Sequence, residues 1–329
     1  MKRYALPLLA LPFLLSCTKN AADTGPTDDS CGVEIDETLP ATGQTDWYYR
    51  SALSFELSDP DDTAVLSVDG VSGTSSLSDD AEMVYFTPDV PLSPNTSYTA
   101  TLEYCTGSAS VDFSTSELGD PVDPDSLVGR THALDLGSGR IVIPEGVGSL
   151  LEGYLDYTIF LGVDSASADS ILLVGAVANE EDPTQQDYCT PTLDFPEADF
   201  SESPYYVIGP ANTTLDVAGY SIEIGELFVS GTYSSDGTWM GGGVLAGSID
   251  TRPLGALLGD DEEEGAICDL VGGFGVDCEN CTDGEPFCLA IEIVDMTAEE
   301  ADGLSLEVIE MENCHEQCPD SASNSECTL

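Results

Sequence analysis

Two histidines, His132 and His315, limit the acid–base chemistry available to this chain of 329 residues. A Ser/His/Asp system needs one of them beside a nucleophile, and no Gly-x-Ser-x-Gly elbow occurs. His132 lies at the start of an expected strand, and His315 lies between Cys314 and Cys318. We interpret both as surface or packing residues. A hydrolase that uses paired carboxylates or a metal is the weaker hypothesis, because no motif supports it. We therefore expect no catalytic residue and no enzymatic activity.

Carboxylates are abundant, with 62 acidic residues against 7 basic ones and a formal net charge of −55. Where they cluster in loops they offer the hard oxygen ligands that calcium prefers, although no cluster has the spacing of an EF-hand loop. The clusters are residues 59–62, residues 260–264, and Asp120 with Asp123 and Asp125. The last is the best calcium candidate, because a cation there would fix the angle between two domains. A solvated acidic surface is the alternative, and we expect no other cofactor.

Eleven cysteines are present, and the first of them, Cys17, is discussed below as a lipid anchor. The other ten form an even number, which in an exported chain favours five disulfides. They are Cys31, Cys105, Cys189, Cys268, Cys278, Cys281, Cys288, Cys314, Cys318 and Cys327. Cys278 and Cys281, with Cys268 and Cys288 nearby, allow a zinc cluster as the alternative, since tetrahedral zinc favours paired thiolates.

The first 17 residues have the composition of a secretory signal. Lys2 and Arg3 form a basic start, an apolar core runs over residues 5–15, and the small Ser16 precedes Cys17. The core is shorter than the roughly 20 residues that a membrane-spanning helix needs. We therefore expect residues 1–17 to be an export signal.

The residues Leu14-Leu15-Ser16-Cys17 resemble the bacterial lipoprotein signal. The resemblance implies that Cys17 receives acyl chains such as palmitate, becomes the new N-terminus and anchors the protein in a membrane. Several acyl chains give a durable anchor, whereas one gives marginal binding. Thr18, rather than Asp, follows the cysteine, which in such lipoproteins favours the outer membrane. An ordinary secreted protein cut near Cys17 is the alternative.

Three polar segments divide the rest of the chain. Residues 18–30 are small and turn-rich, which predicts a flexible tether. Residues 117–126 carry two prolines among acidic residues, which predicts an extended, semi-rigid linker. Residues 319–329 form a polar tail. The sequence therefore predicts a first domain over residues 31–116 and a cysteine-rich second domain over residues 127–318.

Alternating apolar and polar residues predict short antiparallel strands in the first domain, for example Leu53, Phe55 and Leu57. We expect Tyr98 to bury its ring and to return its hydroxyl to the backbone of the preceding turn. The stretch FTPDVPLSPNTSYTATL (residues 86–102), followed by DFSTS (residues 112–116), resembles the bacterial Ig-like domain of surface-layer and envelope proteins, which implies a β-sandwich. Cys31 and Cys105 are the only two cysteines of this domain, so we expect them to pair.

Longer apolar runs predict the strands of the second domain, at residues 140–144, 157–163, 171–178, 220–233, 238–249 and 287–295. Several are apolar on both faces, which suits a sandwich interior or a closed barrel. Asp236-Gly237 predicts a hairpin, and residues 253–258 and 297–303 predict single helical turns. The glycines at 241–243 indicate a bulge or a close backbone approach rather than a phosphate cradle. The sequence thus predicts an all-β chain: an Ig-like sandwich followed by a larger disulfide-stapled sandwich or barrel-like domain.

The net charge excludes nucleic acid as a partner, because phosphates would be repelled. We therefore interpret the chain as a lipid-anchored protein of the cell envelope with a structural, adhesive or interaction role and an unidentified protein partner. The alternative is a carrier, in which runs such as residues 157–163 and 171–178 line a cavity that holds an apolar ligand.

Overall fold

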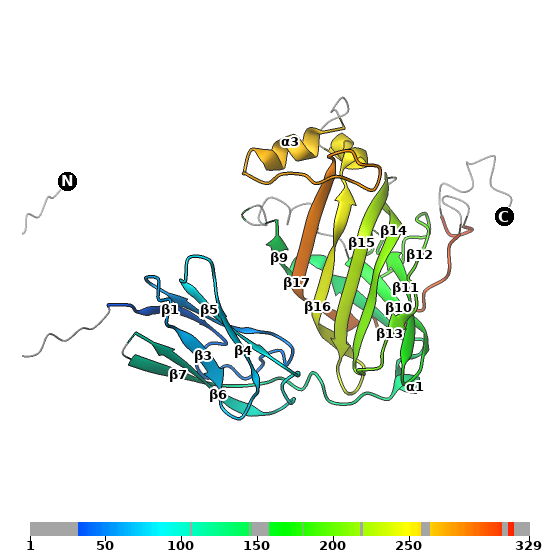
Figure 1. Cartoon of the computed structure of the whole chain (residues 1–329). Coiled ribbons are helices and arrows are strands. Elements are labelled where there is room, and N and C mark those ends of the chain that lie inside the picture. Colours follow the sequence, from blue (N-terminus) through cyan, green and yellow to red (C-terminus); the bar gives the residue numbers. More distant parts are fainter. Residues whose placement is uncertain are drawn as a thin grey trace, which may run out of the picture.

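The structure is a computed structural model that describes residues 32–105, 107–144, 146, 158–179, 181–217, 220–257, 264–310 and 315–318. Nearly all of its regular structure is β, arranged in two domains that a short linker joins (Figure 1). No helix among these residues is long and apolar enough to cross a membrane. The predicted all-β fold class is confirmed.

The first domain is a sandwich of two antiparallel sheets, one in the order β1-β2-β5-β4 and the other in the order β3-β6-β7. Its strands are β1 (Ile35–Leu39), β2 (Leu53–Leu57), β3 (Val65–Val68), β4 (Gly73–Leu77), β5 (Met83–Pro88), β6 (Ser97–Tyr104) and β7 (Gly107–Ser114). Phe55 from one sheet and Leu102 from the other are both 0% exposed and lie in a single core. The two sheets therefore share one interior, as the alternating pattern predicts.

Tyr98 lies as the sequence predicts. Its hydroxyl accepts a hydrogen bond of 2.9 Å from the backbone N–H of Ser93, and its ring stacks on Phe113. Asn95, in the turn between them, takes a positive φ of 49°, a conformation that asparagine tolerates better than most residues. This turn joins β5 to β6 and closes one end of the sandwich.

The linker divides the two cores. Leu118 is buried in the first core and Val122 in the second, so the boundary lies inside the predicted segment 117–126. The prediction of an extended linker is wrong at its end, where α1 (Pro124–Leu127) forms a helical turn. Asp123 caps this turn, and Pro124 stands at its first turn, where its missing N–H costs nothing.

The second domain is built from antiparallel strands. Its elements are β8 (Thr131–Asp135), η1 (Leu136–Ser138), β9 (Arg140–Ile143), β10 (Thr158–Ala166), β11 (Ser170–Val177), β12 (Leu193–Asp194), β13 (Ala198–Asp199), β14 (Tyr205–Val217), β15 (Tyr220–Tyr233), β16 (Trp239–Asp250), η3 (Arg252–Leu257), α3 (Ala266–Gly272) and β17 (Cys288–Glu300). The strands β8, β17, β16, β15, β14, β13, β11 and β10 pair in that order, and β10 pairs again with β8. The sheet therefore closes on itself as a barrel-like ring.

The inside of this ring is apolar and filled by its own side chains. Leu161 and Val163 from β10, Ile171 and Leu173 from β11, and Ile208 from β14 belong to one core, and each is at most 3% exposed. α1 lies at one end of the long strands and α3 at the other, as Figure 1 shows. We refer to these as the α1 end and the α3 end.

The outer face of β10 and β11 is covered by residues 304–310, which we call the C-terminal strap. A Cβ on Gly162 would lie 3.0 Å from the Leu306 side chain, and the buried Phe160 occupies the same strand. Gln186 holds the strap through two hydrogen bonds with the backbone of Glu307, at 2.8 and 2.9 Å. The double-sided apolar pattern of these strands thus reflects a core inside and a strap outside.

One predicted helical turn is wrong. Residues 297–300 continue β17, where Ala298 pairs with Met240 on one side and Leu134 on the other. Ladder hydrogen bonds to two neighbouring strands outweigh the weak helical preference of this short stretch. The turn at residues 253–258 is present as the 3₁₀ helix η3, and Asp236-Gly237 forms the predicted hairpin, in which the backbone N–H of Ser234 donates to the Trp239 carbonyl.

Candidate functional site

His132 is a packing residue inside the second domain. It is 0% exposed, its Nε2 lies 2.8 Å from the carbonyl oxygen of Gly237, and its ring meets the Tyr233 ring at 5.3 Å. Burial lowers the pKa of His132 below its ordinary value, which favours the neutral imidazole. Its Nδ1 and the Tyr233 hydroxyl have no hydrogen-bond partner within the described part of the chain. The contacts of His132 with the described residues, a backbone carbonyl and an aromatic ring, are those of a packing residue.

His315 lies in a different place. Its ring stacks on Tyr188 at 5.0 Å, and its Nε2 lies 3.2 Å from a carboxylate oxygen of Glu307. It thereby fastens the last described residues to the C-terminal strap.

Two of the three linker aspartates use their carboxylates in local hydrogen bonds. Asp120 accepts one of 2.7 Å from the side-chain amide of Asn95, and Asp123 accepts one from the backbone N–H of Asp125. Within the described residues, no three His, Cys, Asp or Glu side chains gather into a group that could hold a metal ion. The predicted calcium ligands are therefore not brought together in this arrangement.

Three disulfides lie within the described residues: Cys189–Cys318, Cys268–Cys278 and Cys281–Cys288. The last two use all four cysteines that the zinc alternative needs, so these thiolates are not free for a metal. Cys105 is also disulfide-bonded, but Cys31 lies outside the described residues, and the pairing of the two remains a prediction. Cys17, Cys314 and Cys327 also lie outside the described residues.

The glycines at 241–243 mark the place where the two domains meet. The register of β16 shifts between Met240 and Gly243. Gly242 has a φ of +59°, and a Cβ there would lie 2.2 Å from the Tyr48 ring of the first domain. A Cβ on Gly241 would lie 2.7 Å from Leu118. The interpretation of a bulge with a close approach is therefore confirmed, and the approaching group is the first domain.

Polar and aromatic contacts complete this interface. The Tyr48 hydroxyl shares a hydrogen bond of 2.7 Å with the hydroxyl of Thr232, which is 0% exposed. The Arg50 guanidinium stacks over the Tyr205 ring at 3.8 Å and pairs with Glu202. Burial raises the pKa of Tyr48, which keeps its hydroxyl protonated for the bond to Thr232. The two domains are therefore docked directly against each other.

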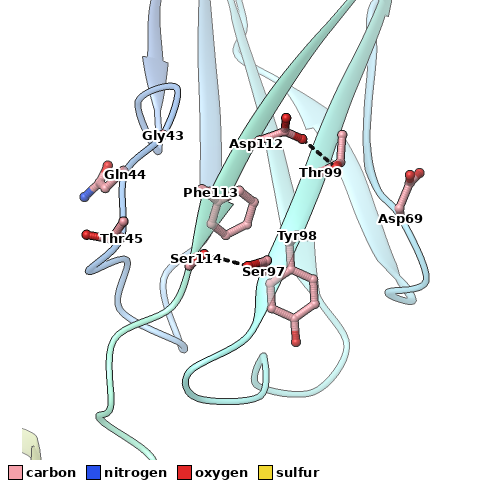
Figure 2. A pocket seen from close by; sticks show the side chains of 10 residues that line it. All are labelled: Gly43, Gln44, Thr45, Asp69, Ser97, Tyr98, Thr99, Asp112, Phe113 and Ser114. Atoms are coloured by element: carbon pink, nitrogen blue, oxygen red, sulfur yellow. Dashed lines mark hydrogen bonds between the residues drawn. The ribbon is translucent and has the colours of Figure 1, made fainter.

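Figure 2 shows a pocket on the first domain, with a volume of about 320 Å³. Four of its polar side chains form two pairs: Thr99 donates to Asp112 at 2.7 Å, and Ser97 bonds Ser114 at 2.9 Å. Phe113 is only 2% exposed, and the half-buried Tyr98 ring stacks on it. The paired side chains of this pocket therefore join β6 to β7.

A larger groove of about 590 Å³ lies at the α3 end of the second domain, and we call it the distal groove. Three exposed glutamates, Glu223, Glu226 and Glu279, line it together with Thr213 and Thr214 of β14. None of the three glutamates takes part in an ion pair within the described residues. The groove can therefore attract cations through unneutralised carboxylates.

Arg252 positions one wall of the distal groove. Its guanidinium bonds both carboxylate oxygens of Asp250, at the end of β16, and Asp283, in the loop of the Cys281–Cys288 disulfide. These hydrogen bonds hold the pKa of Asp250 below its ordinary value. The disulfide and the arginine together fix the loop of residues 281–288, and Glu279, just before this loop, exchanges two backbone hydrogen bonds with Cys288.

No protein-family model and no curated protein matches this chain. Solved structures match weakly. An L,D-transpeptidase 3 from Mycobacterium tuberculosis shows 22% identity over 25% of this chain and 37% of that one, with a TM-score of 0.20. An L,D-transpeptidase from Mycobacterium smegmatis shows 12% identity over 45% of this chain and 81% of that one, with a TM-score of 0.22.

Domains 5–6 of the S-layer protein SbsC show 11% identity over 65% of this chain and 88% of that one, with a TM-score of 0.21. The chain thus spans little more than a third of the length of the L,D-transpeptidase 3 structure that it matches. Scores near 0.2 carry no argument about activity or partners. The description of the fold rests on the strand pairings given above.

The sequence did not point to the interface residues Tyr48 and Arg50 or to the distal groove. The glycines at 241–243 were the available signal for the interface, since a close approach needs an approaching group. The groove had no such signal, because its glutamates come from β15 and from the loop before β17, which only the fold brings together.

Proposed function

We propose that this chain is a lipid-anchored protein of the cell envelope, attached to the outer membrane through Cys17, with a structural or interaction role and no catalytic activity. The sequence Leu14-Leu15-Ser16-Cys17 supports the anchor. One structural observation carries the interaction role: the ring of the second domain packs its own side chains inside, and the first domain docks against it through Tyr48. Such a rigid pair of domains suits the presentation of a surface to a protein partner.

The same observation bears on the carrier alternative. The inward side chains of β10 and β11, which the sequence allows as a cavity lining, are at most 3% exposed and belong to the filled core. A carrier would have to displace this core to admit an apolar ligand, at about 25 cal/mol for each Å² of apolar surface exposed. The packed interior therefore favours the interaction role.

Membrane fractionation with a radiolabelled palmitate feed tests the anchor. The native chain should appear in the membrane fraction and carry label, because acylation needs the Cys17 thiol. Cys17→Ala should lose the label and leave the membrane fraction, whereas Ser16→Ala, which keeps the thiol and a small residue, should behave as the native chain does. A Cys17→Ala variant that stays in the membrane fraction would refute the lipid anchor.

Native mass spectrometry of the chain without residues 1–17 tests the interaction role against the carrier. The expected result is a bare protein mass. A co-purified mass of lipid size, removed by organic solvent, would support the carrier instead and overturn the packed-core interpretation.

Calcium at Asp120, Asp123 and Asp125 remains a separate proposal for the interdomain linker, and binding would require the carboxylates of Asp120 and Asp123 to leave their present hydrogen bonds. A chelator at constant ionic strength tests it. Calcium binding is supported if chelation lowers the melting temperature and if calcium, but not magnesium, restores it. An unchanged melting temperature on chelation would refute the calcium site.

A further inference from the structure

β14 leaves most of one edge unpaired. Its other edge pairs with β15 as far as Val217. On the free side, β13 contacts it at a single position, Asp199 with Val207. No other backbone hydrogen bond reaches this edge from the described residues. About half of the N–H and C=O groups in residues 211–217 therefore point away from any strand.

An unpaired edge is a template for another strand, and proteins usually blunt it with proline, bulges or inward charges. β14 uses proline and a bulge only in its first half, where Pro210 lies and where the register shifts between Ile208 and Thr213. From Thr213 to Val217 the pairing with β15 is regular, and the sequence there holds no proline and no lysine, while its one charged residue, Asp216, is acidic. The regular half of the edge is therefore open to strand addition.

The same edge borders the distal groove, where Thr213 and Thr214 lie beside Glu223, Glu226 and Glu279. All four arginines in the described residues are already paired with carboxylates. The free charges around the edge are thus of one sign. A strand added to this edge would have β14 between itself and Glu223, which pairs with Thr214, so long cationic side chains could reach across β14 into the negative potential of the groove.

We propose that residues 213–217 of β14 bind an extended, cationic segment of a partner protein by strand addition, with lysine or arginine side chains that reach across β14 toward Glu223 and are attracted by the negative potential of Glu226 and Glu279. Backbone hydrogen bonds supply affinity in this mode, and side chains supply selectivity. A second copy of this chain is a poor occupant, because two acidic edges would repel each other. The chain's own residues 18–30 and 319–329 carry three and two acidic residues, which makes them poor occupants for the same reason.

The experiment uses a synthetic seven-residue peptide of alternating lysine and valine as the probe, with the full chain in detergent and calorimetry at low salt. Binding that weakens as salt rises is expected. The matched peptide with glutamate in place of lysine should not bind. Equal binding of the two peptides would overturn the proposed charge complementarity.

Two further peptides distinguish strand addition from charge attraction alone. Each carries N-methyl groups on every second amide, one on the lysines and the other on the valines. Because a bound strand turns only one edge toward β14, one version should lose at least tenfold in affinity and the other should retain binding. Equal affinities of both versions and of the unmodified peptide would overturn strand addition.

Variants and hydrogen exchange locate the site. Glu223→Gln, Glu226→Gln and Glu279→Gln together should weaken peptide binding about tenfold. The control variant removes three exposed carboxylates from the first domain and should change the peptide affinity less than twofold. It carries Asp36→Asn, Glu37→Gln and Glu56→Gln. Backbone exchange in residues 213–217 should slow when the peptide binds. Unchanged exchange there, or a dimer of the free chain in sedimentation, would overturn the proposal.

This inference rests on the proposed interaction role, but different experiments test the two proposals. Membrane fractionation of Cys17→Ala tests the lipid anchor and does not involve β14. If the native chain fractionates with membranes but does not bind the peptide, the proposed function stands and only the proposed binding site on β14 is refuted.

Discussion

The first domain leaves its sheets open, with β1 and β4 at the edges of one sheet and β3 and β7 at the edges of the other. The second domain instead joins eight strands in a ring, although the joint at β13 is only two residues long. Strands in the first domain span 4 to 8 residues, whereas β14 and β15 span 13 and 14. The comparison teaches that the two domains bury their cores in different ways. Short strands of alternating apolar and polar residues suffice in the first domain, whereas the second domain needs pairing between distant strands to close its ring. The stability of the second domain should therefore be more sensitive to mutations where the ring closes.

The largest expected effect comes from the Cys189–Cys318 disulfide, which closes a loop with a sequence separation of 129. In the chain-entropy model, Cys189→Ser with Cys318→Ser should cost about 5 kcal/mol of unfolding free energy, because a long loop loses most freedom when it is closed. Cys281→Ser with Cys288→Ser, at a separation of 7, should cost about 2 kcal/mol. Urea denaturation measures both. Equal losses would contradict the view that the second domain depends on long-range closure.

Phe200 and Phe55, both 0% exposed, compare the two cores directly. Phe200→Ala and Phe55→Ala should each cost about 3–5 kcal/mol through the cavity that they leave. Phe200 lies next to β13, and its backbone N–H bonds the Asp169 carbonyl, so its loss should unfold the second domain first. Trp47 and Trp239 both pack against the core of the first domain, so backbone hydrogen exchange, rather than tryptophan fluorescence, is used to follow the two domains separately.

In this experiment, Phe55→Ala should speed backbone exchange in β2 and β5 and leave exchange in β10 and β11 unchanged. If exchange rises in both domains in both variants, the docked domains unfold as one unit. That result would contradict the proposed difference in stability between the two domains.

Gly242→Ala probes the contact between the domains. It should cost about 1–3 kcal/mol, because alanine is strained at a φ of +59° and its Cβ would collide with Tyr48. In a Tyr48→Ala background the collision disappears, and the cost should fall to the conformational part of about 1 kcal/mol. A double-mutant cycle by urea denaturation measures the difference. Additive costs would mean that Tyr48 does not rest on Gly242.

His132 gives the smallest expected effect, seen as a dependence on pH. Because burial lowers the pKa of His132, the folded chain binds fewer protons than the unfolded chain as pH falls below about 6.5. The stability that neutral His132 contributes is present above that pH and is lost below it, by up to about 1.4 kcal/mol per pH unit.

His132→Gln, which cannot titrate, should lack this loss. The difference in unfolding free energy between the native chain and the variant should therefore shrink between pH 7 and pH 5. Parallel curves over this range would show that His132 does not resist protonation in the fold. The first domain contains no histidine, so its transition provides an internal control.

Strand positions could be predicted well where one face is buried. The β2 alternation and the run that became β15 were both visible, because side-chain period and length suffice to identify them. β14 was missed, since Gly209, Pro210 and Asn212 read as a loop and only pairing with β15 makes the segment a strand. α3 was missed because Gly265 offers no side-chain cap.

The candidate sites were harder to predict than the fold. Acidic residues are so numerous that composition alone could not separate Glu223 and Glu279 from the rest. The calcium hypothesis rested on nearness in sequence, whereas Asp120 and Asp123 turn toward different hydrogen-bond donors. A site whose residues come from distant strands forms only when the strands pair into the ring, and no local sequence pattern predicts that pairing.

The Cys189–Cys318 bridge also determines how the protein responds to tension. A pull between a membrane-attached N-terminal end and residue 318 would pass along the chain to Cys189 and then directly across the disulfide. Residues 190–317, which include β12 to β17, would lie outside the load path and could not be extended by that pull. Stretching would instead be confined to the first domain, the linker and β8 to β11. The distal groove and the free edge of β14 would therefore keep their shape while the rest of the molecule is under strain.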